Sequence, residues 1–170
     1  MTDTFPAFSL GPVPQPVPGA PAPELFRGIY GMPMFVTVPS ADVAASSDFW
    51  VRGLGFFELF AVPGVSPSPM VHLRRWAFQD VLLVAGEPAA QAPAQTVSFS
   101  CVLDQVDEIA AACEQVLAGS TTGPRTTPWN TVDLEVVTPE GTRVVMTAAR
   151  PWDPDSAEAA ALREIGIDRP

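Results

Sequence analysis

The sequence carries one pattern twice, FVTVPSADVAASSDFWVRGLG at Phe35–Gly55 and SFSCVLDQVDEIAAACEQVLAG at Ser98–Gly119. Each copy opens with the apolar residues of a strand, passes through a short polar corner and continues as an amphipathic helix. Three further strand-like runs follow the first copy, and at least two follow the second, with room for a third. The chain is therefore predicted to be an α+β protein. Two tandem βαβββ modules would form a curved mixed sheet around a cleft, with helices on the outer face.

Breakers and caps set the expected limits of the elements. The first strand is predicted over Met34–Val38, where Pro39 ends it and Ser40 caps the following helix. Asp104 is predicted to cap a second helix over Val106–Leu117. The remaining strands are predicted at Phe56–Val62, Met70–Ala77, Gln79–Val84, Thr96–Leu103, Trp129–Val137 and Thr142–Ala148. Ser120–Pro128 (STTGPRTTP) is predicted to be a polar loop that holds at most a short strand.

The chain divides into an N-terminal arm at 1–32, a domain at 33–149 with modules 33–86 and 94–149, and a tail at 150–170 with a short helix. Residues 1–24 hold seven of the twenty prolines, and such a stretch favours extended backbone and forbids helix. Leu25–Tyr30 (LFRGIY) is apolar again, so we expect it to pack on the domain or on a second subunit. Glu87–Pro93 is predicted to link the modules.

The chain is acidic, with a net charge of −10, a sequence pI of about 4.3 and no lysine among its nine basic residues. This charge argues against nucleic acid or an anionic membrane as a partner and favours a cationic ligand. Cys101 and Cys113 lie on apolar stripes and are expected to be buried free thiols in a reducing compartment. With no signal-peptide pattern and no apolar run near the ~20 residues of a membrane span, the protein is expected to be cytoplasmic.

Three local patterns in the sequence belong together. The first lies in 39–56, with Asp42, Phe49–Trp50 and Leu54–Gly55–Phe56; the second is Asp104–Gln105–Val106–Asp107; the third is Pro128–Trp129 followed by Thr138–Pro139–Glu140–Gly141–Thr142. In this order they resemble the vicinal-oxygen-chelate superfamily, which includes glyoxalase I, extradiol dioxygenases, fosfomycin-modifying enzymes and bleomycin-resistance proteins. Asn130, Thr138 and Thr142 depart from the glycine, aspartate and asparagine that are usual in this hairpin. The resemblance covers roughly 33–149 and implies the βαβββ fold predicted above.

Metal enzymes of the superfamily place His, Gln or Glu at matching points of the two modules. The resemblance maps these positions onto Phe35, Ser98 and Val145, with a fourth around Leu83. None of these side chains is a good ligand for a divalent metal. A metal enzyme would instead need the one histidine, His72, with carboxylates such as Glu58 or Glu135 in an unfamiliar arrangement.

We therefore predict a binding protein without a metal or other cofactor, similar to the bleomycin-resistance type, that holds a cationic or aromatic small molecule, plausibly an antibiotic or a metabolite. The predicted ligand contacts are Phe35, Phe60, His72, Arg74, Trp76, Ser98, Trp129 and Val145. The resemblance also implies a homodimer. Two alternatives stay open: a glyoxalase-like lyase or dioxygenase with a metal site around His72, and a protein-interaction module that uses its acidic surface or proline-rich arm.

Overall fold

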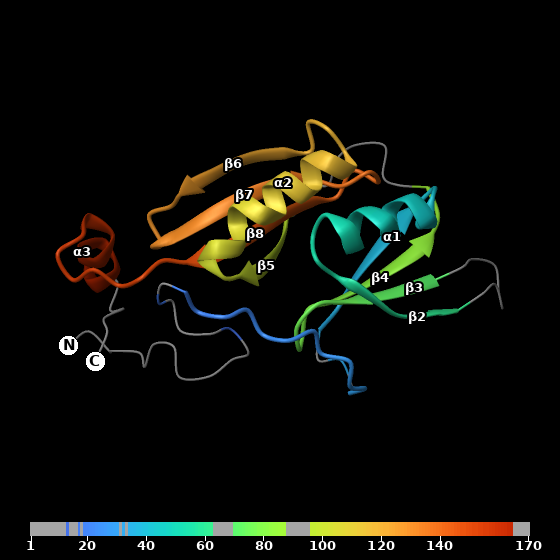
Figure 1. Cartoon of the computed structure of the whole chain (residues 1–170), viewed down its shortest axis with the longest axis horizontal. Helices are drawn as coiled ribbons and strands as arrows, with labels where there is room; N and C mark the ends of the chain where they lie inside the picture. The colour runs from blue at the N-terminus through green and yellow to red at the C-terminus, as the bar shows by residue number, and fades with distance from the viewer. Residues whose placement is uncertain are drawn as a thin grey trace.

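A computed structural model describes residues 13, 17, 19–30, 32, 34–62, 70–87 and 96–164. The first module contains β1 (Val36–Ser40), α1 (Val43–Arg52), β2 (Phe57–Val62), β3 (Met70–Arg74) and β4 (Asp80–Ala85). The second contains β5 (Val97–Cys101), a short 3-10 turn, α2 (Val106–Val116), β6 (Thr121–Thr126), β7 (Thr131–Val137) and β8 (Arg143–Ala149). The tail forms α3 (Ala157–Glu164), which lies beside the second module in Figure 1. The predicted α+β fold with two βαβββ modules is confirmed.

Both modules build the same four-stranded mixed sheet. The strand order is β1-β4-β3-β2 in the first and β5-β8-β7-β6 in the second. In each sheet the strand before the helix pairs in parallel with the last strand of its module, and the other pairs are antiparallel. The repeated sequence pattern therefore corresponds to a repeated topology.

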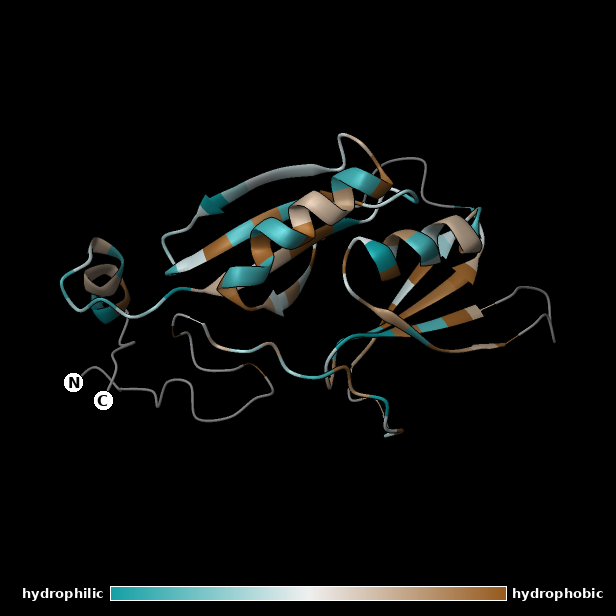
Figure 2. Ribbon diagram, in the orientation of Figure 1, coloured by the Kyte–Doolittle hydropathy of each residue, from teal (hydrophilic) through white to brown (hydrophobic). Residues whose placement is uncertain are grey.

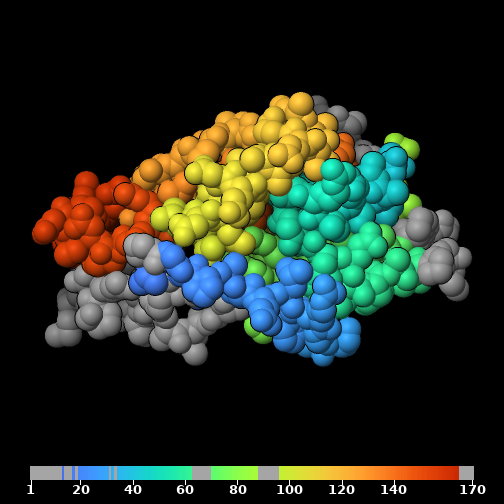
Figure 3. Space-filling view, in the orientation of Figure 1, coloured from blue at the N-terminus to red at the C-terminus, as the bar shows by residue number. Residues whose placement is uncertain are grey.

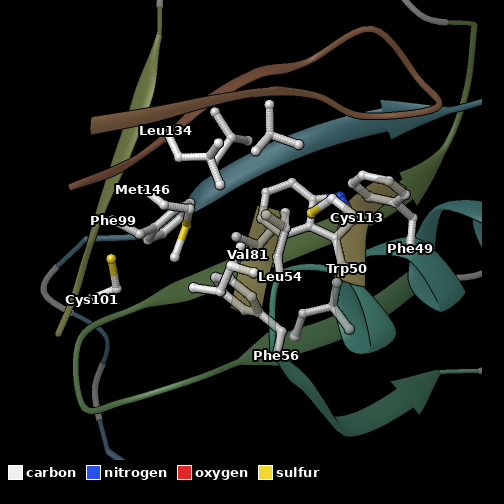
Figure 4. Packing of buried hydrophobic residues seen from close by; sticks show 14 of the residues in the cluster. Phe49, Trp50, Leu54, Phe56, Val81, Phe99, Cys101, Cys113, Leu134 and Met146 are labelled. Atoms are coloured by element: carbon white, nitrogen blue, oxygen red, sulfur yellow. The ribbon is translucent and has the colours of Figure 1, made fainter. Parts of the chain in front are cut away.

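The core joins the two modules through their helices. Trp50 of α1 packs edge-on against Phe56, with ring centroids 5.1 Å apart, and against Phe99 of the second module at 6.0 Å. Cys113 of α2 and Leu134 and Met146 of the second sheet belong to the same buried cluster, as Figure 4 shows. In Figure 2 the colour along β7 alternates between apolar and more polar residues, as expected for a strand that buries one face. The two modules therefore share one hydrophobic core.

Several element limits differ from the predictions. β1 continues through Pro39 to Ser40, which an edge strand tolerates because the missing N–H of Pro39 is not needed by a second neighbour. Asp42, not Ser40, caps α1, since its side chain accepts a hydrogen bond from the backbone of Ala45 at 3.0 Å. Residues 121–126 form the full strand β6, although they contain Gly123 and Pro124. This strand is also an edge, and its register shifts between Thr122 and Arg125.

Some of the remaining predictions are confirmed, and others are wrong or concern residues that the structure does not describe. Leu25–Tyr30 packs on the domain, as expected. Cys101 and Cys113 are buried and free. A 3-10 turn over Leu103–Gln105 precedes α2, so Asp104 does not provide its cap. The linker beyond Glu87 and most of the proline-rich stretch lie outside the described residues. None of the described helices is long and apolar enough to cross a membrane.

Candidate functional site

Each sheet turns one face toward the helices and one face away from them. In the first module Val38, Leu73 and Val81 are buried on the helix side. The side chains that alternate with them project from the side that faces away from the helices. From here on, outer face means this helix-free side of the sheet, and not the helix-covered side of the predicted fold. The outer face of this sheet carries Thr37, Phe57, Phe60, Met70, His72, Arg74, Asp80 and Leu82. It is thus the aromatic and ionisable surface of this module.

One end of this outer face holds a buried polar cluster around Asp80. The carboxylate Oδ1 accepts a hydrogen bond from Arg74 Nε at 2.6 Å and lies 2.8 Å from His72 Nε2. Its Oδ2 accepts a hydrogen bond from the Tyr30 hydroxyl at 2.6 Å. The Nδ1 of His72 is buried and has no hydrogen-bond partner among the described residues. The cluster is therefore a compensated ion pair with one unused imidazole nitrogen.

The N-terminal arm covers this cluster. The Tyr30 ring lies 4.1 Å from the Arg74 guanidinium, and Arg74 also donates to the Gly28 carbonyl. The backbone N–H of Phe78 donates to the Tyr30 oxygen at 2.6 Å, and that of Phe26 donates to the Arg75 carbonyl at 3.0 Å. Burial and the hydrogen bond to Asp80 raise the pKa of Tyr30 above its usual value of 10.0. The arm is thus bonded to the outer face through both side chains and backbone.

A cavity of about 230 Å³ lies where the first strands of the two modules approach each other. Phe35, Phe78 and Phe99 give it aromatic walls, and Ser98 and Gln79 contribute polar groups. The Gln79 side chain is more than nine-tenths buried and donates from Nε2 to the Ser100 carbonyl at 3.0 Å. Its Oε1 has no partner in the described structure. The cavity therefore combines apolar walls with a nearby hydrogen-bond acceptor that is not used.

The outer face of the second module is more polar. Asp133 Oδ1 accepts hydrogen bonds from the hydroxyls of Thr131 at 2.8 Å and Thr147 at 2.7 Å. Glu135 pairs with Arg143 at 2.5 Å and with Arg125. The hydrogen bond from Arg143 lowers the pKa of Glu135 below its usual value of 4.5. These bonds join three strands, because Arg125 lies in β6 and Arg143 and Thr147 lie in β8, so no local sequence pattern reveals them.

One known protein family matches most of this chain in sequence. The sequence model of the Glyoxalase/Bleomycin resistance protein/Dioxygenase superfamily matches residues 34–146, well over half of the chain. The chain belongs to this superfamily. The match spans both modules, from the residues before β1 into β8. The search of curated proteins found no match.

Solved structures share the fold at low sequence identity. The fosfomycin resistance protein FosX from Listeria monocytogenes is 14% identical with a TM-score of 0.58, over 72% of this chain and 95% of that one. The bleomycin resistance determinant of transposon Tn5 is 22% identical with a TM-score of 0.50, over 69% and 98%. An integron cassette protein from the Halifax Harbour sewage outfall is 24% identical with a TM-score of 0.53, over 71% and 99%. At these identities the likeness concerns the fold alone.

The positions onto which the resemblance maps the metal ligands of superfamily enzymes do not carry side chains that fit a divalent metal in this chain. Phe35 and Ser98 line the cavity, and Val145 pairs with Ser98 in the second sheet. Leu83 is fully buried in the core. A phenyl ring, a hydroxyl and two aliphatic side chains do not supply the imidazole and carboxylate ligands that a divalent metal prefers.

The alternative metal set around His72 is not assembled either. Glu58 accepts a hydrogen bond from Ser47 of α1 at 2.5 Å, so it lies on the helix side of the sheet, away from His72. Glu135 lies in the other sheet between two arginines. In the described part of the chain, no group of three or more His, Cys, Asp or Glu residues could hold a metal ion.

The other predicted ligand contacts are scattered. Phe60 is 42% exposed and packs edge-on against the His72 ring, with centroids 5.0 Å apart. Trp129 is 67% exposed in the turn before β7. Trp76 is 1% exposed and lies outside β3, because the strand that was predicted over Met70–Ala77 ends at Arg74. Trp76 lies instead under the Arg75 guanidinium, whose central carbon is 4.6 Å from the ring centroid.

Sequence reasoning missed Tyr30, Gln79, Asp80 and Glu140. Glu140, in the β7–β8 turn, is buried and accepts hydrogen bonds from Ser46 at 2.7 Å and from the Trp50 indole at 3.0 Å. These pairs are more than 80 residues apart, so no local pattern reveals them. Asp80 had a usable signal, because a carboxylate at the start of an apolar strand beside His72 and Arg74 needs a partner.

Proposed function

We propose that this protein binds a small molecule without a metal, in the manner of a bleomycin-resistance protein that sequesters an antibiotic or a metabolite. The observation that carries the proposal is the cavity of about 230 Å³ between the modules. Phe35 and Ser98 line this cavity, and the resemblance maps both onto positions where metal enzymes of the superfamily place ligands. A cleft with an aromatic side chain at such a position is suited to stacking on a ligand and poorly suited to Lewis-acid chemistry.

The ligand class follows from the lining. Aromatic walls favour a flat ring, and each ring contact contributes about 0.5–1.5 kcal/mol beyond its buried area. The unused Oε1 of Gln79 favours a ligand that carries an N–H or O–H donor, because a buried acceptor without a partner costs roughly 1–3 kcal/mol. The net charge of −10 adds a preference for cationic molecules. We therefore propose a heteroaromatic or cationic ligand with at least one donor near Gln79.

We further propose that the protein works as a homodimer. The first module leaves large apolar side chains in solvent: Phe35 beside the cavity, and Phe60 and Val62 in β2, at 38–46% exposure. Large exposed apolar side chains are typical of surfaces that are covered in an assembly. A second copy would enclose the cleft and complete its walls. Light scattering on the full chain tests this, and a monomer at micromolar concentration would contradict it.

The test of the binding function is a fluorescence titration with bleomycin and with a panel of aromatic, cationic natural products. Phe35→Ala should weaken binding about twofold to tenfold, which corresponds to one ring contact of about 0.5–1.5 kcal/mol. Val137→Ala is the matched control, since Val137 is exposed at the end of β7 and does not line the cavity. The proposal would be contradicted by a binding affinity that is unchanged in Phe35→Ala, or by the absence of binding across the panel.

The two alternative functions give different results in the same experiments. A metal enzyme would show stoichiometric metal after purification and turnover of an α-ketoaldehyde thiol adduct or a catechol. The ion pair of Asp80 with Arg74 disfavours that outcome at His72, because the guanidinium occupies the carboxylate oxygen nearest the imidazole. An interaction module would bind no small molecule, either with or without added metal.

A further inference from the structure

Arg75 is a buried cation that the proposed cleft does not use. Its neighbour Arg74 points to the outer face, so Arg75 points the opposite way, into the junction between the modules. The Arg75 side chain donates from Nη1 to the Ser100 carbonyl at 2.9 Å and from Nη2 to the Gln105 side chain at 2.9 Å. Arg75 thus connects the first module to the second.

The charge of Arg75 has no acidic partner. The residue is only 2% exposed, and none of the ion pairs found among the described residues includes it. Both hydrogen-bond acceptors are neutral, and burial lowers the pKa of the guanidinium below its usual value of 12.5. A buried cation without a counter-charge is costly, and the site would be stabilised by an anion.

A second cavity lies against this guanidinium. Its volume is about 430 Å³, within the range of small-molecule sites, and it is separate from the cavity at Phe35. Its walls come from the arm, the turn after α1, Arg75–Trp76 and the first half of α2: Pro23, Glu24, Leu25, Arg52, Gly53, Gly55, Gln105, Glu108, Ile109 and Ala112. In Figure 3 the blue arm, the yellow start of α2 and the teal end of α1 meet on one face of the molecule.

The Nε–H of Arg75 is a donor that remains available on the cavity side. Its Nε makes no hydrogen bond to any described residue, whereas the two terminal nitrogens are engaged. Gly55 lies next to it, and a Cβ at Gly55 would be 3.6 Å from this Nε. Gly55 has φ +74°, a conformation that favours glycine, so the backbone that forms the turn also leaves the guanidinium without a covering side chain.

We propose that this cavity binds a small organic monoanion, a carboxylate attached to an apolar or aromatic body, through Arg75. The carboxylate would accept from Arg75 Nε, and the body would lie against Leu25 and Ile109. Glu24 and Glu108 at the exposed rim disfavour ligands with several negative charges, while Arg52 is engaged by Asp48 at 2.9 Å. The anion site shares no lining residue with the cleft proposed above. The proposal of an anion site would therefore stand even if no ligand bound in that cleft.

The test is a titration of the full chain with benzoate at constant ionic strength, followed through the arginine Nε–H signals in nitrogen-15 spectra. We expect a saturable shift at Arg75 in the millimolar range and none with benzamide, the neutral analogue. Ala112→Phe fills the cavity without removing Arg75. This variant should weaken the binding of benzoate at least about tenfold, which equals about 1.4 kcal/mol of binding free energy. Arg75→Gln should abolish binding, and Ala112→Phe keeps the test informative if Arg75→Gln does not fold.

Three results would overturn the proposal. The first is the absence of a saturable shift at Arg75. The second is equal binding of benzamide, which would show that the cavity takes apolar bodies regardless of charge. The third is a benzoate response that is unchanged in Ala112→Phe or equally large at the exposed Arg125 and Arg143.

Discussion

The contact between the N-terminal arm and the outer face of the first module can be weakened by removing a single oxygen atom. Tyr30→Phe deletes the hydroxyl that donates to Asp80 Oδ2 at 2.6 Å and accepts from the Phe78 N–H at 2.6 Å. A hydrogen bond to a charged group contributes about 1.5–3 kcal/mol, so we take about 2 kcal/mol as the loss. The ring contact with Arg74 is retained in the variant. The population of molecules with a released arm should therefore rise about thirtyfold.

Limited trypsin digestion measures this release. Arg27 is exposed within the arm, and cleavage after it requires the arm to leave the sheet. Cleavage after Arg52, at the end of the folded helix α1, reports global unfolding and serves as the internal control. We expect cleavage after Arg27 to accelerate about thirtyfold while cleavage after Arg52 changes far less. Equal acceleration at both sites, or no change at Arg27, would refute the assignment of the Tyr30 hydroxyl as a local clamp.

The same contact predicts a dependence on alkaline pH. The pKa of Tyr30 is raised in the folded state, so its contribution is fully present below the usual value of 10.0 and is lost as the pH rises above it. Arm release in the wild type should increase above pH 10, and Tyr30→Phe should lose this dependence. A wild-type release rate that stays flat across this range would contradict the role of the neutral phenol.

Three further predictions concern the body of the domain. Glu140→Ala removes the acceptor of the buried Ser46 hydroxyl and Trp50 indole and should lower the free energy of unfolding in urea by roughly 2–4 kcal/mol, against little change for the exposed control Glu108→Ala. Glu135 has a lowered pKa, so its contribution to stability is present above pH 4.5 and is lost as the pH falls through the folded-state value; Glu135→Gln should flatten the acid limb of the stability curve. Burial raises the pKa of Cys101 to about 11 and of Cys113 to about 12, so neither should react with iodoacetamide at pH 8 unless the protein unfolds, and rapid labelling of the native state would show that the core opens.

The fold could be predicted because its signals are local. The strand–corner–helix pattern at 35–55 and 98–119 corresponds to β1–α1 and β5–α2. The apolar face of the first helix, with Phe49 and Trp50, is buried in the core. At 120–128 at most a short strand was predicted, because propensity argues against Gly123 and Pro124 in a strand, whereas the edge position of β6 with its register shift admits them.

The site could be predicted less well, because its contacts are long-range. Phe35 and Ser98 do line one cavity, although they are 63 positions apart in the printed sequence. The bond from Tyr30 to Asp80 spans 50 residues, and the bond from Ser46 to Glu140 spans 94. The strand predicted over Met70–Ala77 ends at Arg74 in the structure, so Trp76 lies beyond β3 and is buried. Strand limits at this precision are set by tertiary packing rather than by the local pattern.

The most direct test of metal-free binding is a calorimetric titration of bleomycin and related cationic aromatics into the protein after chelation, and again after reloading with zinc, nickel, manganese or iron(II). We predict the same saturable heat and affinity in every state, no stoichiometric metal in the purified protein, and no turnover. Binding or turnover that appears only with a stoichiometric metal would contradict the proposal and would make His72→Ala the next variant to examine.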